Sequence, residues 1–296
     1  MSSNARSAKA PGGAVKKSKS FKPGERIAKW FVRIILIVFV LITIYPMIFV
    51  LLTSLKTTND FYNNIWGLPK VYEWANYTYA WMTASIGKYF LSSIIVVFVV
   101  VVVTLVLSAL AGYALAKLDI PKADTVMIVI FMLTMLPSES VLMPMYLMTS
   151  KMKILGTHLS LILPYIGWGL AFATYIYRNF FKTVPTEIME AARIDGCTET
   201  ATFVKVVMPM MLPATATNAI FCFLSWWGEM LWASVDLSTS SIKTLPLGIT
   251  AFVQSAGTDW GPLCAASCII LVPVVLFFLF TQKYFIAGLT GGAVKG

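Results

Sequence analysis

The chain has 296 residues, of which 58% are hydrophobic and 12% charged, and its mean hydropathy is +0.79. Soluble domains carry about 25% charged residues, so this composition excludes an ordinary soluble protein and indicates several membrane-spanning helices. The formal net charge of +10 comes without a recognisable nucleic-acid module, which argues against a nucleic-acid partner.

The N-terminal segment is basic and poor in apolar residues. Nine of the first 33 residues are Lys or Arg, and they stand directly before a long apolar run. Such a block marks the cytoplasmic side of a membrane protein. We therefore predict a disordered, basic cytoplasmic tail over residues 1–25, followed by a membrane domain over residues 26–296.

Six long segments beyond the tail carry almost no charge. Each is long enough for the roughly 20 apolar residues that cross the hydrocarbon layer. If all six cross and both termini are cytoplasmic, seventeen of the 23 Lys and Arg lie on the cytoplasmic side, as that topology requires. The predicted fold class is an all-α polytopic membrane protein. The predicted spans are residues 32–55, 89–116, 125–150, 159–178, 206–232 and 261–283.

Two carboxylates fall inside these segments, and each needs a reason because burial in a membrane costs roughly 2.5–3.5 kcal/mol near a helix centre. Such a group either locks helices together through an interior hydrogen bond or lines a translocation path. For Glu139 we favour the interior hydrogen bond. For Glu229 we favour the path, because Trp226 and Trp227 supply flat apolar faces beside a hydrogen-bond acceptor.

A polar segment between the fourth and fifth spans has a specific pattern. Pro185 suits the start of a helix, Gly196 suits a left-handed helix end, and Thr198 suits the cap of a second helix. We therefore predict two short cytoplasmic helices over about residues 185–205. The first should present Ile188, Ala191 and Ala192 on one apolar face and allow Glu190 to pair with Arg193.

Residues in and after this segment resemble the EAA signature of the membrane subunits of ATP-binding-cassette importers. The run Glu190-Ala-Ala-Arg-Ile-Asp-Gly196 is similar to the version in binding-protein-dependent sugar permeases of the maltose-permease type. An amphipathic loop helix lying on lipid headgroups is the alternative interpretation. The residues that carry the resemblance are Glu190, Ala191, Ala192, Arg193, Asp195, Gly196, Phe203, Pro209 and Pro213.

The resemblance implies the type I ABC importer transmembrane-domain fold, in the plasma membrane of a bacterium. It implies a permease subunit that translocates a sugar or oligosaccharide delivered by an extracellular solute-binding protein. Its partners would be a second permease subunit, as a related chain in a heterodimer or as a second copy, and two ATP-binding subunits. The signature residues would couple to those ATPase subunits, and Trp226, Trp227, Glu229 and Glu139 are the candidates for the substrate path.

Nothing in the sequence suggests that this chain is itself an enzyme. It contains no phosphate-binding P-loop, so ATP and Mg²⁺ are expected on the partner ATPase subunits and no cofactor on this chain. Four cysteines and one histidine show no metal-ligand spacing. An ion-coupled secondary transporter of a small polar solute is the alternative function, but it should show inverted repeats, and no internal symmetry is evident. A membrane scaffold without transport activity is a third possibility.

Overall fold

The computed structural model describes residues 23–254 and 257–293, and the tail predicted over residues 1–25 lies almost entirely outside them. Most of the described residues are helical, and the strands among them form one two-residue antiparallel pairing. The described residues divide into two compact units, with the boundary between Phe49 and Val50. The elements are α1 (Pro23–Thr53), α2 (Thr58–Asn63), α3 (Ala75–Thr78), η1 (Tyr79–Thr83), α4 (Ile86–Lys117), α5 (Ala123–Met132), η2 (Leu133–Met135), α6 (Ser138–Lys151), α7 (His158–Lys182), α8 (Thr186–Ile194), α9 (Glu199–Ala201), η3 (Thr202–Val207), α10 (Met208–Met210), α11 (Leu212–Trp227), α12 (Leu231–Asp236), α13 (Leu245–Ile249), η4 (Thr250–Phe252), β1 (Val253–Gln254), β2 (Gly257–Thr258) and α14 (Trp260–Ala293).

Four of these helices are long and apolar enough to cross a membrane alone, and two bent pairs bring the number to six if each pair forms one span. The single helices overlap the predicted first, second, fourth and sixth spans. The four candidate spans are Lys29–Thr53, Ile86–Lys117, His158–Lys182 and Trp260–Lys283. The chain is therefore a multi-pass membrane protein.

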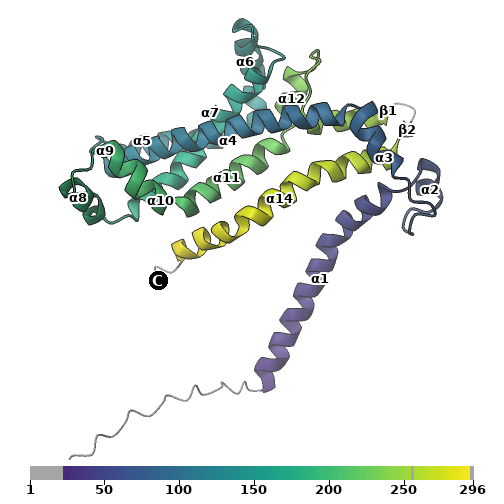
Figure 1. Ribbon diagram of the computed structural model, residues 1–296, viewed down its shortest axis with the longest axis horizontal. Coiled ribbons are helices and arrows are strands. Elements are labelled where there is room, and N and C mark those ends of the chain that lie inside the picture. The colour runs from purple at the N-terminus through teal and green to yellow at the C-terminus, as the bar shows by residue number, and fades with distance from the viewer. Residues whose placement is uncertain (1–22, 255–256, 294–296) are drawn as a thin grey trace, which may run out of the picture. The chain divides into compact units, whose positions relative to one another are not determined.

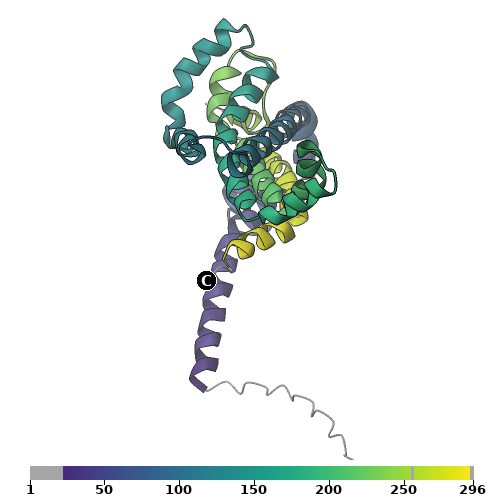
Figure 2. The same cartoon turned by 90° about the vertical axis from the view of Figure 1, so that its left-hand side faces the viewer.

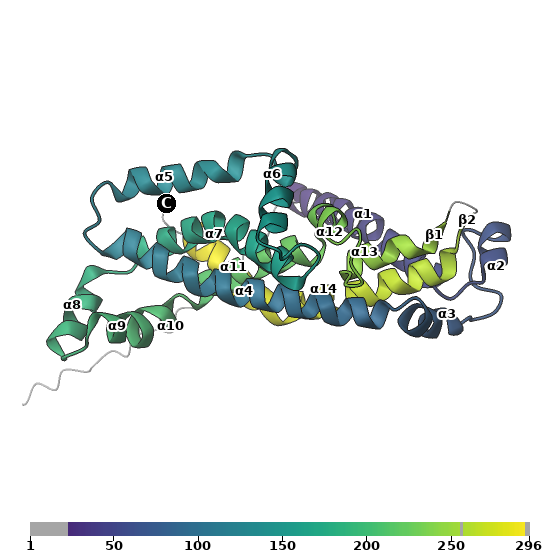
Figure 3. The same ribbon diagram turned by 90° about the horizontal axis from the view of Figure 1, so that it is seen from above.

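The third predicted span is not one straight helix. The segments Ala123–Met135 and Ser138–Lys151 meet at 94°. Leu136 and Pro137 have extended ψ angles of 125° and 128° at this bend. Leu136 precedes a proline, and the residue before a proline avoids the helical region. Figures 2 and 3 show α5 and α6 arching over one side of the helix bundle.

The fifth predicted span is also bent. The segments Glu199–Met210 and Leu212–Asp236 meet at 75°, just before Pro213, which stands in the first turn of α11 where its missing N–H leaves no hydrogen bond unmade. At its other end α11 stops at Trp227, and Gly228 precedes the short helix α12. The carboxylate of Glu229 therefore lies in the connection between two helices and not in the middle of one.

The core of the second unit is built around α4 and α7, which lie side by side along much of their length, with α11 and α14 packed next to them (Figure 1). Gly112 of α4 makes this close approach possible. A Cβ atom at Gly112 would lie 2.8 Å from the Cβ of Tyr177 and 3.0 Å from the backbone nitrogen of Arg178. Because α4 and α7 touch through backbone at this point, a movement of one is passed directly to the other.

Candidate functional site

The helix, glycine corner and second helix predicted from the sequence are present between α7 and α11. Helix α8 begins after Pro185, Gly196 has a φ of +82°, and the Thr198 hydroxyl accepts a hydrogen bond from the backbone of Ala201 at 3.3 Å. A positive φ is readily adopted only by glycine. We call residues 185–205 the coupling segment. In Figure 1 its helices α8 and α9 lie at one end of the α4–α7 pair.

The predicted small apolar face of α8 is divided: Ala191 is exposed, whereas Ala192 is buried together with Met189. The predicted ion pair of this segment is wrong. Arg193 pairs with Glu199, at 2.7 Å between Nε and Oε1, and not with Glu190, because the turn at Gly196 brings the start of α9 back toward the end of α8. The hydrogen bond that Arg193 donates to Glu199 raises the pKa of the Arg193 guanidinium above its usual value.

The nine signature residues divide into a surface group and a group that shapes the backbone. Phe203 packs against Tyr113 of α4, with ring centroids 4.8 Å apart, and Pro209 and Pro213 stand at the starts of α10 and α11. Ala192 is buried. One side of the coupling segment therefore packs against the helix bundle, and the other side is exposed. The exposed members are Glu190, Ala191, Arg193, Asp195 and Gly196.

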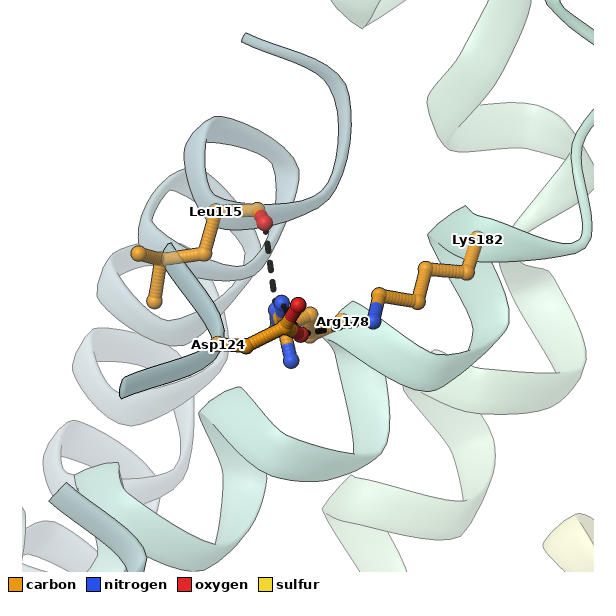
Figure 4. A network of polar contacts seen from close by, with 4 residues as sticks. All are labelled: Leu115, Asp124, Arg178 and Lys182. Carbon is orange, nitrogen blue, oxygen red and sulfur yellow. Dashed lines mark hydrogen bonds and ion pairs between the residues drawn. The ribbon is translucent and has the colours of Figure 1, made fainter. Parts of the chain in front are cut away.

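Hydrogen bonds tie the end of α7 and the residue directly before the coupling segment to the end of α4. The Lys117 ammonium donates to the carbonyl of Val184 at 2.6 Å. Arg178, which is buried, donates through Nε to the carbonyl of Leu115 at 3.1 Å and forms an ion pair with Asp124 at 2.6 Å. Lys182 contacts the same carboxylate at 3.1 Å (Figure 4). We call Leu115, Asp124, Arg178 and Lys182 the α4–α7 clamp.

The α4–α7 clamp was not predicted from the sequence. The available signal was a basic residue at the inner end of one span and an acidic residue at the start of another. The carbonyl of Leu115 gives no such signal, because every residue carries one. Since the side chain of Asp124 is 79% exposed, the buried hydrogen bond to Leu115 is the stronger part of this contact.

A cavity of about 670 Å³ lies between the α5–α6 bend, α7 and α11. This volume is in the range of small-molecule sites, which are mostly apolar with a few polar groups. Here the apolar wall comes from residues such as Leu136, Leu142 and Phe172, and one helical face of α11 contributes the polar groups. Those groups are Asn218, Ser225 and Trp226, followed by Glu229 just beyond the helix, and the α5–α6 bend adds the hydroxyls of Thr134 and Ser138.

Aromatic rings form a stack at this cavity. The ring of Trp226 lies parallel to that of Tyr165, with centroids 4.6 Å apart, and to that of Trp168, at 6.0 Å. Trp226 and Trp168 line the cavity. Trp227 lies elsewhere in the bundle, where it is buried against Phe223 and donates its Nε1 hydrogen to the carbonyl of Ile270 at 3.1 Å.

The two candidate carboxylates have different surroundings. Glu229 lines the cavity and accepts hydrogen bonds from the backbone of Trp232 at 2.7 Å, the backbone of Ala233 at 3.2 Å, and the hydroxyl of Tyr165. It therefore caps α12 and holds the aromatic stack. Glu139 is exposed, and it accepts a hydrogen bond from the hydroxyl of neighbouring Ser138 at 3.2 Å. The interior hydrogen bond expected for Glu139 is instead made by Glu229.

We expect Glu229→Ala to lower the free energy of unfolding by about 2–3 kcal/mol, because two backbone N–H groups and the Tyr165 hydroxyl lose a charged acceptor. Glu229→Gln keeps one acceptor oxygen and should lose about half as much. Glu139→Ala is the matched control and should stay within about 0.5 kcal/mol. Denaturant titration of the purified protein in detergent measures the free energy of unfolding of all three variants. Equal stability of the Glu229→Ala and Glu139→Ala variants would contradict this assignment.

Asn218 was missed by the sequence interpretation. Its side chain is 1% exposed, and its Nδ2 donates to the carbonyl of Ala173 at 3.2 Å, while its Oδ1 accepts no hydrogen bond from the described residues. The Nε1 of Trp226 is likewise buried, and it lies beside the sulfur of Cys222. Unpaired buried polar atoms are uncommon, and both of these residues line the cavity.

Comparisons with known proteins agree on one family. The family model described as binding-protein-dependent transport system inner membrane component matches residues 105–289. The arabinooligosaccharides transport system permease protein AraQ of Halalkalibacterium halodurans is 32% identical over 91% of this chain and 98% of its own length. The diacetylchitobiose uptake system permease protein NgcG of Streptomyces coelicolor is 33% identical over 88% of this chain and 87% of its own length. A bacterial ABC transporter that imports the acidic polysaccharide alginate contains a chain of the same fold, with a TM-score of 0.75 and 20% identity over 90% of this chain and 100% of that chain.

Proposed function

Because the chain belongs to the family of binding-protein-dependent transport system inner membrane components, we propose that it is the permease subunit of an ATP-driven importer of a sugar or oligosaccharide. The observation that carries this proposal is the pair of features on one helix bundle: an exposed coupling segment at one end and a cavity with aromatic walls beside α11. The names of the relatives supply the sugar class.

The proposed topology has six spans with both termini in the cytoplasm, a basic tail over residues 1–25 and a transmembrane domain over residues 26–296. The two bent pairs count as one span each in this topology. The coupling segment is then cytoplasmic, and the loops before α4 and before α14 face the outside. The charge asymmetry of the loops supports this orientation.

The proposed complex contains a second permease subunit, two ATP-binding subunits and an extracellular solute-binding protein. ATP and Mg²⁺ are held by the ATP-binding subunits. The exposed members of the coupling segment, Glu190, Ala191, Arg193, Asp195 and Gly196, contact those subunits, while Ala192, Phe203, Pro209 and Pro213 hold the segment in shape. Within the bundle, Trp226 and Glu229 are the members of the predicted substrate path that line the cavity.

Closure of the ATP-binding subunits moves the coupling segment, and the protein transmits that movement through packed helices. Two connections serve this purpose. Val184 and Met189 pack with Ala109 and Tyr113 of α4, and the α4–α7 clamp joins α4 to α7. Because α7 and α11 form walls of the cavity, a rigid-body rotation of these helices changes the side on which the cavity opens.

The test is transport into proteoliposomes that contain the complex, its solute-binding protein and a panel of labelled oligosaccharides. Uptake should require ATP on the side of the membrane that the ATP-binding subunits face. It should persist when a protonophore removes the proton gradient. Uptake by the purified chain without any ATPase subunit, or loss of uptake with the proton gradient while ATP is kept, would show an ion-coupled transporter instead.

A further inference from the structure

We propose that Gly167 of α7 sets the upper size limit of the saccharide that the cavity beside α11 accepts. This role rests on the proposed sugar-import function, and it concerns the length of the substrate and not its chemical class. Three observations support it: Gly167 has no packing partner that requires a glycine, it is exposed to the cavity, and α7 forms the least bulky wall of that cavity.

The first observation concerns the glycines within the helices. Glycine inside a helix is less favourable than alanine, so each one needs a structural reason. Gly112 of α4 has such a reason, since a Cβ atom there would lie 2.8 Å from the Cβ of Tyr177. Gly169 of α7 has one too, since a Cβ atom there would lie 3.2 Å from the Cγ2 of Thr104. A Cβ atom at Gly167 would meet no atom from elsewhere in the described chain within 4 Å.

The second observation is that the open space beside Gly167 belongs to the cavity. Gly167 lines the cavity and is exposed, so a ligand reaches its Cα atom and the backbone around it. Glycine allows the closest approach of a ligand to a backbone, because no Cβ atom stands in between. A side chain at this position would take up part of the cavity of about 670 Å³ without displacing any described residue.

The third observation is that the walls of the cavity differ in bulk. Of the six α7 residues that line it, four are Gly or Ala, whereas the α5–α6 bend and α11 contribute large side chains such as Leu136 and Phe221. The alanines Ala171 and Ala173 are buried, so larger side chains there would collide with their neighbours. Gly167 is therefore a position on α7 where a larger side chain would change the cavity alone.

A glycine in a membrane-spanning helix can also allow close packing against another helix, and the second permease subunit would supply that helix. A helix with its side chains is about 10–12 Å in diameter. To reach Gly167 it would have to enter a cavity of about 670 Å³ that side chains of the α5–α6 bend and of α11 also line. The position of Gly167 therefore favours a role toward substrate.

The experiment measures how the side chain at position 167 changes the length of the saccharide that is transported. Proteoliposomes contain the complete complex and its solute-binding protein. The probes are three labelled series of increasing length: arabinose oligomers, N-acetylglucosamine oligomers, and melibiose with raffinose and stachyose. Each probe is supplied at a concentration that saturates uptake. Uptake by each variant is divided by uptake of the same probe by the unmodified complex, which removes the preference of the solute-binding protein.

Gly167→Leu should lower relative uptake of the longest transported member of a series at least about tenfold more than that of the shortest member. Gly167→Trp should shift this ratio further, and Gly167→Ala should shift it less than about threefold, because a single methyl group fills little space. Gly228→Leu is the matched control and should leave the ratio unchanged. Gly228 is exposed, does not line the cavity, and has the carbonyl oxygen of Leu224 as its nearest neighbour, at 4.0 Å from a Cβ atom.

The outcomes separate the size role from the proposed function. Equal losses for every length, or no loss in Gly167→Leu and Gly167→Trp, would overturn the size role and leave the sugar importer standing. If the Gly167→Leu chain reaches the membrane but no longer copurifies with the second permease subunit, Gly167 serves subunit contact, and the size role is again overturned. If the unmodified complex takes up no probe, the sugar assignment fails and the size role fails with it.

Discussion

We expect Gly196→Val to lower sugar-stimulated ATP hydrolysis and transport at least tenfold in a complex that still reaches the membrane. Gly196 has a φ of +82°, and a side chain in that conformation costs roughly 1–2 kcal/mol, with the greatest strain for a β-branched residue. The corner between α8 and α9 would relax away from that conformation and misplace the exposed surface of the coupling segment. Uptake and ATPase assays in proteoliposomes measure the effect.

Gly196→Asn separates two causes of this loss. Asparagine tolerates a positive φ, so it preserves the backbone while adding a side chain. A Cβ atom at Gly196 would meet no atom of this chain within 4 Å, and any obstruction must therefore come from a docked partner. If transport is lost in Gly196→Val alone, the cause is the strained backbone. If transport is lost in both variants, the cause is a side chain that obstructs a docked partner. Full transport by both variants would refute the coupling role of Gly196.

The second large effect is expected for Arg178→Ala, which should lower the free energy of unfolding by about 2–3 kcal/mol and reduce transport more than tenfold. Arg178 is buried, and its removal leaves the carbonyl of Leu115 without its donor. Loss of the α4–α7 clamp also separates the coupling segment from the helices beside the cavity. Thermal unfolding of the assembled complex and transport rates measure the two consequences.

Arg178→Lys and Lys182→Ala are the controls for this prediction. Lysine keeps the charge but cannot reach Leu115 and Asp124 with a planar fork, so we expect it to recover less than half of the stability. Lys182 contacts the exposed side of Asp124 at 3.1 Å, and its removal should cost less than about 0.5 kcal/mol. If Arg178→Ala behaves like Lys182→Ala, the buried hydrogen bond does not hold the clamp together.

Local features of the coupling segment could be predicted from the sequence. A proline before a helix, a glycine at a left-handed corner and a threonine cap each act within a few residues, and all three lie where they were expected. Contacts around the corner could not be predicted in the same way. Whether Arg193 pairs with Glu190 or Glu199 depends on how far the chain turns back after Gly196.

The cavity residues could be predicted only in part. Trp226 and Trp227 are neighbours, separated by about 100° around the helix, so periodicity places them on different faces but does not say which face meets the cavity. Packing decides which tryptophan meets the cavity, because Phe223 and the carbonyl of Ile270 hold Trp227 away from it. The role of Glu229 as a cap also depended on where α12 begins.

By itself, the sequence determined the class of protein, the positions of the apolar segments and the backbone of the coupling segment, because hydropathy, charge asymmetry, glycine and proline act locally along the chain. Only the tertiary structure decided the unpaired acceptor of Asn218, the partners of Glu229 and the α4–α7 clamp. Each of these depends on atoms brought together from distant parts of the chain. A hydrogen-bonding group shows whether it is satisfied only when its neighbours in space are known.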